Sequence, residues 1–236
     1  MIPIDKLSAC LEPFGLTLTT QQDEEIDTYS KFLLEYNEKV NLTAITHPEE
    51  IAIKHFADSI LPLALTEITP GASLIDVGTG AGFPGVPLKI MRPDIALTLL
   101  DSLNKRLNFL QELSALLRQD NAFVHARAEM AGADPKLRGR FDYATSRAVA
   151  QLAVLCEYCL PLLKVGGKML ALKGPDCTAE IAAAKHAIEV LGGSIAAVQA
   201  YGLADHGQRT LIIIEKVKTT PGKYPRQRIK LSEKPL

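Results

Sequence analysis

The segment with the clearest chemical potential is a glycine-rich run, LIDVGTGAGFPG, at residues 74–85. An apolar stretch leads into Gly78, Gly80 and Gly82, and a helix is expected to begin near Phe83. Glycines in such a turn let the backbone adopt positive φ and let a ligand approach the main chain closely. Ligands of open α/β sheets bind just beyond the carboxyl ends of the strands. The run therefore predicts a ligand site built largely from backbone.

Two carboxylates accompany this run. Asp76 lies in the last turn of the predicted strand, and Asp101 ends the next predicted strand, 23 residues after Gly78. A carboxylate at the second position can accept hydrogen bonds from both hydroxyls of a ribose. Asp76 is expected near an ammonium group of the ligand. This pair favours a ligand that combines a nucleoside with an amino-acid end.

The glycine pattern fits two classes of cofactor. Residues 80–85 spell G-x-G-x-x-G, the dinucleotide pattern, which leaves an NAD-dependent oxidoreductase open. A pyrophosphate needs free amides at a helix N-terminus, and Pro84 and Pro87 remove two of them. The sequence also has no Tyr-x-x-x-Lys pair. S-adenosylmethionine therefore fits these residues better than NAD does.

Strand and helix patterns alternate around this run. We expect strands at 73–77, 95–100, 122–126, 141–145 and 167–172, a final hairpin at 195–201 and 210–217, and helices from 83, over 103–117, over 151–163 and over 178–191. This alternation predicts an α/β fold with a doubly wound, mostly parallel sheet, covered by helices on both faces and carrying an antiparallel C-terminal strand.

The first sixty residues have a helical pattern instead. Apolar side chains recur with spacings of three and four from Ile26 to Val40, which predicts an amphipathic helix capped by Thr19 or Thr20. A second helix is expected near Pro48. We therefore divide the chain into a helical N-terminal extension (1–62), a core (63–217) and a basic C-terminal tail (218–236).

The composition, 47% hydrophobic and 22% charged over 236 residues, is that of an ordinary globular chain. The N-terminus does not resemble a signal peptide, and no apolar run approaches the ~18 residues that a membrane span needs. We expect a soluble, cytoplasmic protein.

From Lys216 onward there are seven Lys or Arg residues against one acid, a formal charge of +6, while the rest of the chain carries −7. Such a tail is typical of an RNA-binding arm, and equally of a solvated, disordered terminus.

Seven collinear runs between residues 41 and 226 carry a family resemblance: NLTAI (41–45), KHFADS (54–59), IDVGTGAGFPGVPLKI (75–90), LLDSLNKR (99–106), SRA (146–148), LKG (172–174) and TPGKYPR (220–226). Together they resemble the bacterial RsmG/GidB family of 16S rRNA guanine-N7 methyltransferases. The resemblance implies a class I S-adenosylmethionine-dependent (Rossmann-like) fold. It also implies methylation of a guanosine in the 530 loop, at position 527 of the rRNA. The implied partner is 16S rRNA or the small ribosomal subunit.

The resemblance also implies the contacts with the cofactor. Together with the loop residues, the expected cofactor-binding set is Asp76, Gly78, Gly80, Gly82, Phe83, Asp101, Ala128, Glu129 and Arg147. Guanine N7 has a lone pair and no proton, so the transfer needs alignment rather than a general base. We therefore expect no catalytic acid or base. Arg147 and Lys173, which follow strands, are candidates for orienting the ligand or the target.

N7 is hidden in the deep major groove of A-form RNA, so the target base must lie in a loop or be extruded. Basic side chains near the strand ends or in the tail are the candidates for binding the RNA: Lys54, His55, Arg106, Lys173, Lys223, Arg226 and Arg228. We expect that deleting residues 218–236 weakens RNA binding and flattens its salt dependence without changing cofactor affinity.

The other chemically active residue types have simpler interpretations. Cys156 and Cys159 lie in a predicted helix with no further ligands spaced to complete a zinc site, so we expect buried thiols and no metal. His125, in an apolar strand, is expected to be a core histidine. Besides the oxidoreductase, a methyltransferase for another substrate and a non-catalytic rRNA-binding assembly factor stay open.

Overall fold

A computed structural model describes residues 2–227 and 229–236. Its centre is a seven-stranded sheet with strand order β3-β2-β1-β4-β5-β7-β6. All neighbouring strands pair in parallel except β7, which is antiparallel to both β5 and β6. The strands are β1 (Ser73–Val77), β2 (Ala96–Asp101), β3 (Ala122–His125), β4 (Phe141–Arg147), β5 (Leu163–Lys173), β6 (Gly193–Gly202) and β7 (Gln208–Lys216). The predicted doubly wound sheet with an antiparallel C-terminal strand is confirmed.

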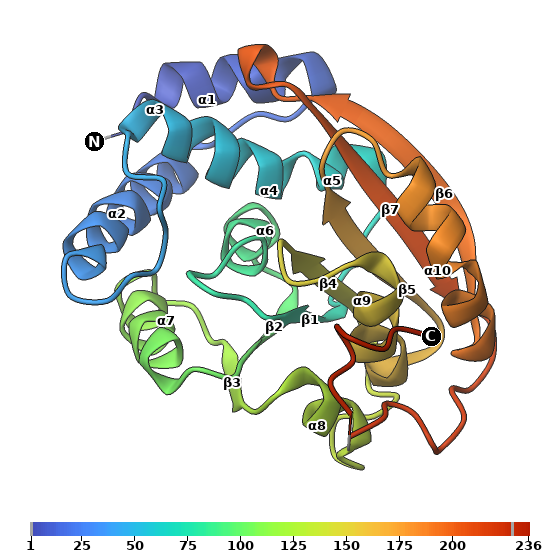
Figure 1. The fold of residues 1–236 in the computed structure, drawn as a ribbon. Coiled ribbons are helices and arrows are strands. Elements are labelled where there is room, and N and C mark those ends of the chain that lie inside the picture. The colour runs from blue at the N-terminus through green and yellow to red at the C-terminus, as the bar shows by residue number, and fades with distance from the viewer. Residues whose placement is uncertain (1, 228) are drawn as a thin grey trace.

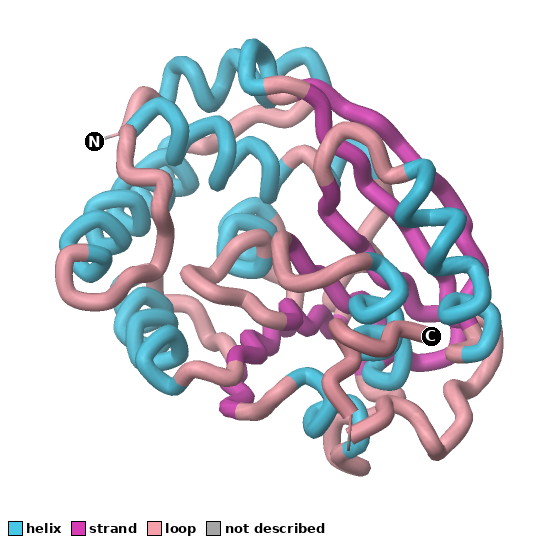
Figure 2. The backbone as a smooth tube through the Cα atoms, viewed as in Figure 1, coloured by secondary structure: helices cyan, strands magenta, loops and turns pink. Residues whose placement is uncertain are grey.

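Helices cover both faces of the sheet (Figures 1 and 2). They are α1 (Ile4–Leu11), α2 (Thr20–Asn37), α3 (Pro48–Glu50), α4 (Asp58–Ile60), α5 (Pro62–Leu65), α6 (Gly85–Met91), α7 (Asn104–Leu116), α8 (Ala128–Ala133), α9 (Leu152–Cys159) and α10 (Thr178–Val190). Alternate residues of each central strand enter opposite cores because strand side chains have a period of two. Leu74 of β1 faces the N-terminal helices, α6 and α7, whereas Ile75 faces α9 and α10.

The N-terminal helices belong to the same hydrophobic core as the sheet. A reciprocal capping box between Thr19 and Gln22 starts α2, as expected for Thr19. Ile26, Tyr29 and Leu33 are fully buried on its inner face. The helix ends at Asn37, so the predicted stripe leaves the helix before Val40. Through this face α2 contacts α6 and α7, close to the glycine-rich loop.

Some elements differ from the predictions. The helix expected over 151–163 ends at Cys159, and β5 already begins at Leu163, four residues before the predicted strand. His125 is exposed rather than buried, because β3 is an edge strand. Its Nε2 lies 3.1 Å from the backbone oxygen of Ser102. Cys156 and Cys159 are buried free thiols, as predicted, and Cys10 and Cys177 are buried free thiols as well.

The described part of the C-terminal tail packs on the protein. Tyr224 and Leu231 are buried, and the end of the chain lies beside α8 and α9 (Figure 1). Arg228 lies outside the described residues. Among the residues that are described, no helix is long and apolar enough to cross a membrane.

Candidate active site

A cavity of about 830 Å³ opens at the carboxyl ends of β1, β2, β4 and β5, on both sides of the point where the strand order reverses between β1 and β4. This is where doubly wound sheets bind ligands, and the volume suits a ligand of nucleoside size or larger. The N-terminal segments 42–45 and 54–58 supply part of its wall. Of the predicted cofactor contacts, Gly78, Gly80, Phe83, Asp101, Ala128, Glu129 and Arg147 line the cavity.

The glycine-rich loop forms the floor of the cavity. Gly78 has a φ of +71°, and its amide donates to the backbone oxygen of Leu100. A Cβ at Gly78 would lie 2.6 Å from Cγ2 of Val149, in the loop that follows β4. Only glycine therefore lets these two loops approach each other at the site. Gly82 faces the other way, towards Tyr29 and the core, and does not line the cavity.

Asp76 fixes the glycine-rich loop through hydrogen bonds made on the side of the loop away from the cavity. Its carboxylate is fully buried, and Oδ2 accepts hydrogen bonds from Thr79 Oγ1 (2.6 Å) and from the Gly85 amide (3.0 Å). Burial raises the pKa of Asp76 to about 6. Because Asp76 does not line the cavity, the structure does not place it at a ligand ammonium group. The correction is that Asp76 holds the loop, and it uses the first amide of α6 to do so.

Asp101 stands at the end of β2 with its side chain 2% exposed. Oδ2 accepts from the Gly80 amide (3.0 Å) and from Arg106 Nη1 (3.2 Å), while Oδ1 accepts from the Leu103 amide (2.9 Å). Nε of Arg106 is buried with no partner among the described residues. A carboxylate with a remaining lone pair beside an unsatisfied donor suits a polar ligand with hydroxyl groups, such as a ribose.

An aromatic stack joins the N-terminal helices to the loop. The Phe83 ring lies between Tyr29 (centroids 5.0 Å apart) and His55 (4.5 Å), both nearly parallel to it. The Tyr29 hydroxyl donates to the backbone oxygen of Ala81 (2.5 Å). These contacts fix the side of the loop that faces the cavity. Such pairs add to the stability that burial already gives.

His55 is a neutral imidazole. Its Nδ1 lies 3.3 Å from Nη2 of Arg147, a group that can only donate, so Nε2 carries the proton and donates to Thr43 Oγ1 (2.8 Å). Burial and the neighbouring guanidinium lower the pKa of His55 to about 3. His55 is 9% exposed and contacts Arg147 at the cavity wall, and its role in RNA binding stays a prediction.

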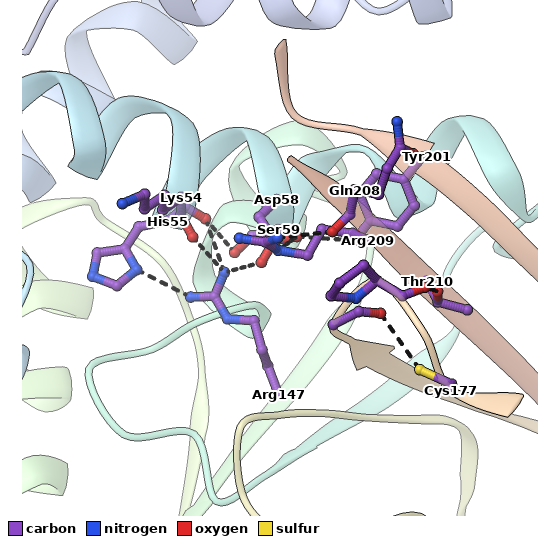
Figure 3. Close-up of polar contacts among 12 residues, drawn as sticks. Lys54, His55, Asp58, Ser59, Arg147, Cys177, Tyr201, Gln208, Arg209 and Thr210 are labelled. Atoms are coloured by element: carbon purple, nitrogen blue, oxygen red, sulfur yellow. Dashed lines mark hydrogen bonds and ion pairs between the residues drawn. The ribbon is translucent and has the colours of Figure 1, made fainter. Parts of the chain in front are cut away.

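Arg147, the last residue of β4, is bound by residues 54–58 of the N-terminal part of the chain (Figure 3). Its Nη1 donates to Asp58 Oδ2 (2.8 Å) and to the backbone oxygen of Lys54 (3.0 Å). Residues Ile51–Ala57 are π-helical, so the Asp58 amide donates to the backbone oxygen of Ile53, five residues back. In an α-helix this amide would donate to the Lys54 oxygen, which here accepts from Arg147. Single π-helical turns of this kind are frequent at functional sites.

Asp58 is the centre of this cluster, and the sequence analysis did not select it. Its Oδ1 accepts from the Tyr201 hydroxyl (2.9 Å) and lies 3.8 Å from Arg209 Nε, so one carboxylate ties β4, β6 and β7 to the N-terminal helices. Asp58 and Arg209 both line the cavity. The signal was present in KHFADS, where Asp58 follows Lys54 and His55 by one helical turn.

Lys173 fixes the loop after β4. Its Nζ donates to the Ala150 oxygen and to Glu180 Oε1, each at 2.7 Å, and the same Oε1 accepts from the Leu152 amide (2.6 Å). Within this loop Ala148 has a φ of +57°. A non-glycine residue in that region is strained, and the clamp holds it there. Lys173 therefore lines the cavity as a positioning group that already has partners.

The other predicted RNA-binding cations are mostly paired. Lys54 forms an ion pair with Glu50, and Arg106 pairs with Asp101. Arg226 is bound by the buried Glu157, and its RNA-binding role stays a prediction. Lys223 is exposed, with its Nζ 5.2 Å from the centroid of the Tyr224 ring. The RNA-binding prediction for Arg228 concerns a residue outside those that the structure describes.

The fold is that of the class I methyltransferases. The structure is similar to the ribosomal protein L11 methylase of Lactobacillus delbrueckii subsp. bulgaricus, with a TM-score of 0.53 and 18% identity over 70% of this chain and 79% of that one. It is also similar to a putative methyltransferase of Bacillus halodurans, with a TM-score of 0.50 and 14% identity over 69% of this chain and all of that one. At these identities the likeness shows the fold alone.

The family follows from the sequence comparisons. The GidB model, described as rRNA small subunit methyltransferase G, matches residues 22–212. Proteins named ribosomal RNA small subunit methyltransferase G are 50% identical over 96% of both chains in Lactobacillus johnsonii and 47% identical over 98% of both in Clostridium beijerinckii. The chain belongs to the GidB family. The predicted enzyme class, an S-adenosylmethionine-dependent rRNA methyltransferase, is confirmed, and the oxidoreductase is set aside.

Proposed function

We propose that this enzyme transfers a methyl group from S-adenosylmethionine to N7 of a guanosine in the 530 loop of 16S rRNA. The family membership supports the reaction and the class of RNA. The observation that carries the choice of N7 is that three titratable groups of the cavity wall, His55, Asp58 and Asp101, are already engaged within the protein.

The cavity offers matching groups for each end of the cofactor. Asp101 would accept from the ribose hydroxyls, and the backbone of Gly78 and Gly80 would face the methionine end. Ala128 and Glu129, at the start of α8, would form the wall beside the base. When bound, the cofactor supplies an electrophilic methyl group on a sulfonium. The fit rests on the glycine floor, the buried Asp101 and Arg106 Nε, which has no partner in the part of the chain that the structure describes.

Methylation of N7 requires no proton transfer, because this nitrogen has a lone pair and no hydrogen. The carboxylates of Asp58 and Asp101 are held by arginines and amides. Both nitrogens of His55 have partners, and the pKa of His55 is lowered to about 3 by burial and Arg147. A reaction at an exocyclic amine or a hydroxyl would need a base in this wall. These residues instead suit an enzyme that works by alignment.

The chain's own residues would perform that alignment. The Lys173–Glu180 clamp holds the loop after β4, and Val149 of this loop contacts the glycine floor. Arg147 is held by Asp58 at the same edge of the cavity. A target base extruded into the cavity would thus meet a rigid wall. Because Arg147 is paired with Asp58, its guanidinium group is not free to bind N7 of the target base, where it would block the attack of N7 on the methyl group.

Methyl transfer with chemical mapping tests the proposal. Methyl-labelled S-adenosylmethionine is incubated with unmodified small-subunit rRNA, both as naked RNA and as particles. Borohydride and aniline then cleave the strand at 7-methylguanosine. We expect label and a single cleavage in the 530 loop. Label without cleavage would mean that the methyl group is transferred to an atom other than N7. The absence of label with either form of the RNA would contradict the assigned reaction.

A further inference from the structure

The C-terminal strap, which we define as residues 218–227, is bound to the two helices that form one wall of the cavity. Arg226 approaches α9: its amide and Nε donate to Glu157 Oε1 at 2.7 and 2.9 Å, and its Nη2 donates to Oε2 at 2.7 Å. The side chain of Glu157 is 1% exposed. Over residues 2–227 and 229–236, Arg226 is the partner that balances this buried charge.

The strap also packs on α8. A Cβ at Gly132 would lie 2.8 Å from the Pro225 ring, so the proline lies directly against the helix backbone. Tyr224 is buried in the same cluster as Ala131 of α8 and Leu155 of α9. Residue 132 thus has no room for a side chain while the strap is in place, and the strap fills the space between the two helices.

A second arginine closes the contact from the other side. Arg138 donates from Nη1 to the backbone oxygens of Gly132 (2.9 Å) and Tyr224 (2.7 Å), and from Nη2 to that of Thr220 (2.8 Å). One guanidinium therefore ties the end of α8 to two points of the strap. A planar, multiply donating group of this kind fixes geometry as well as contributing energy.

Both helices reach the cavity. Ala128 and Glu129 of α8 and Tyr158 of α9 line it, and Tyr158 directly follows the carboxylate that Arg226 holds. We infer that the C-terminal strap is a positioning element for the cofactor wall and that Arg226 and Glu157 are positioning residues for cofactor binding. This inference rests on the proposed cofactor site. It departs from the RNA-binding role expected of the tail, because the strap's arginine is engaged inside the protein.

The strap would change affinity by a population shift. If the wall is in place in only a fraction of molecules, the apparent dissociation constant for the cofactor rises in inverse proportion to that fraction. Linkage also requires the reverse effect, so a bound cofactor must stabilise the docked strap. Two measurements follow, one on variants and one on the unaltered protein.

The first measurement is calorimetric titration of S-adenosylmethionine into Arg226→Gln, with Lys230→Gln as a control. The control removes one positive charge from an exposed tail residue that pairs with Glu233 rather than with α9. We expect binding to Arg226→Gln to be about tenfold weaker, which corresponds to about 1.4 kcal/mol, and binding to Lys230→Gln to be unchanged. KM for the cofactor should rise while kcat at saturation stays the same. The double variant Glu157→Gln/Arg226→Gln should recover part of the affinity, because it leaves no buried charge unpaired.

The second measurement is amide hydrogen exchange of the wild-type protein with and without S-adenosylhomocysteine. Exchange in residues 218–227 should slow when the ligand binds. This experiment decides the question even if Arg226→Gln does not fold. Wild-type protein that fails to bind the cofactor would overturn the proposed cofactor site and the strap inference together.

Wild-type binding with equal affinity in a folded Arg226→Gln and no change in exchange would overturn the strap inference alone. Weaker RNA binding with a flatter salt dependence in Arg226→Gln, at unchanged cofactor affinity, would also overturn it and would restore the basic-arm interpretation.

Discussion

Asp101 is the residue whose proposed role is most directly tied to the cofactor. Asparagine has the same shape, but its Nδ2 cannot accept a hydrogen bond from a ribose hydroxyl. Hydrogen bonds to charged groups contribute about 1.5–3 kcal/mol, so we expect Asp101→Asn to bind S-adenosylmethionine about 10–100-fold more weakly while staying folded. Calorimetric titration measures the affinity, and circular dichroism measures the fold.

The matched control is Asp94→Asn. Asp94 lies before β2, at the opposite edge of the sheet, where Arg92 binds its carboxylate and holds its pKa well below the ordinary value. Its substitution should leave cofactor affinity unchanged. Equal affinities for the Asp94 and Asp101 variants would remove the ribose assignment.

Asp58 acts through Arg147 rather than on the ligand. Asp58→Asn leaves two guanidinium groups without a carboxylate and places an amide beside Arg147. Because a displacement of about 1 Å at a reacting site can cost about a hundredfold in rate, we expect kcat for methyl transfer to fall by about that factor. Single-turnover assays with saturating cofactor measure it. The control is Ser59→Ala, which alters a buried neighbour whose hydroxyl donates to the backbone oxygen of His55 and touches no carboxylate among the described residues. If both variants are equally active, Asp58 has no positioning role.

At the scale of elements, the glycine-rich loop and the loop after β4 act as a pair. Gly78→Ala places a Cβ 2.6 Å from Val149 Cγ2 and also strains a backbone with a φ of +71°. Gly71→Ala is the matched control, because Gly71 has a φ of +68° but open space around it. Both should lose about 1–2 kcal/mol of stability from the backbone alone. Only Gly78→Ala should also lose cofactor binding in titration; equal binding by the two variants would show that the loops do not depend on their close contact.

The elements that follow local rules were the ones that could be predicted from the sequence. Alternation and length mark the strands, and glycine with Asp101 marks the edge of the sheet where the cavity lies. The π-helical turn at 51–57 could not be predicted, because its reason is tertiary: it presents the backbone carbonyl of Lys54 to Arg147, 93 residues further along the chain. The contact of Arg226 with the buried Glu157 could not be predicted for the same reason, since the basic composition of the tail does not reveal it.

At the scale of the whole molecule, two buried groups make stability depend on pH in opposite directions. The pKa of Asp76 is raised from 3.8 to about 6 in the folded state. Between these values the folded protein binds more protons than the unfolded chain, so this group's contribution falls as pH rises, by about 3 kcal/mol in total. The pKa of His55 is lowered from 6.5 to about 3. Here the unfolded chain binds more protons, so the contribution is complete above pH 6.5 and is lost as pH falls towards 3.

Single variants should therefore separate two slopes that oppose each other in the wild-type protein. Asp76→Asn keeps an acceptor for Thr79 and Gly85 but cannot titrate, so its free energy of unfolding should rise more steeply from pH 4 to 6 than that of the wild type. His55→Gln removes the other slope, so its free energy of unfolding should rise less over the same range, or fall. Urea unfolding at pH 4, 5, 6 and 7 measures the free energy of unfolding of each protein. Subtracting the wild-type value from that of each variant at the same pH cancels the contributions of the other titrating groups. Parallel curves for all three proteins would mean that the loop and the arginine cluster are not held by buried groups in the charge states assigned here.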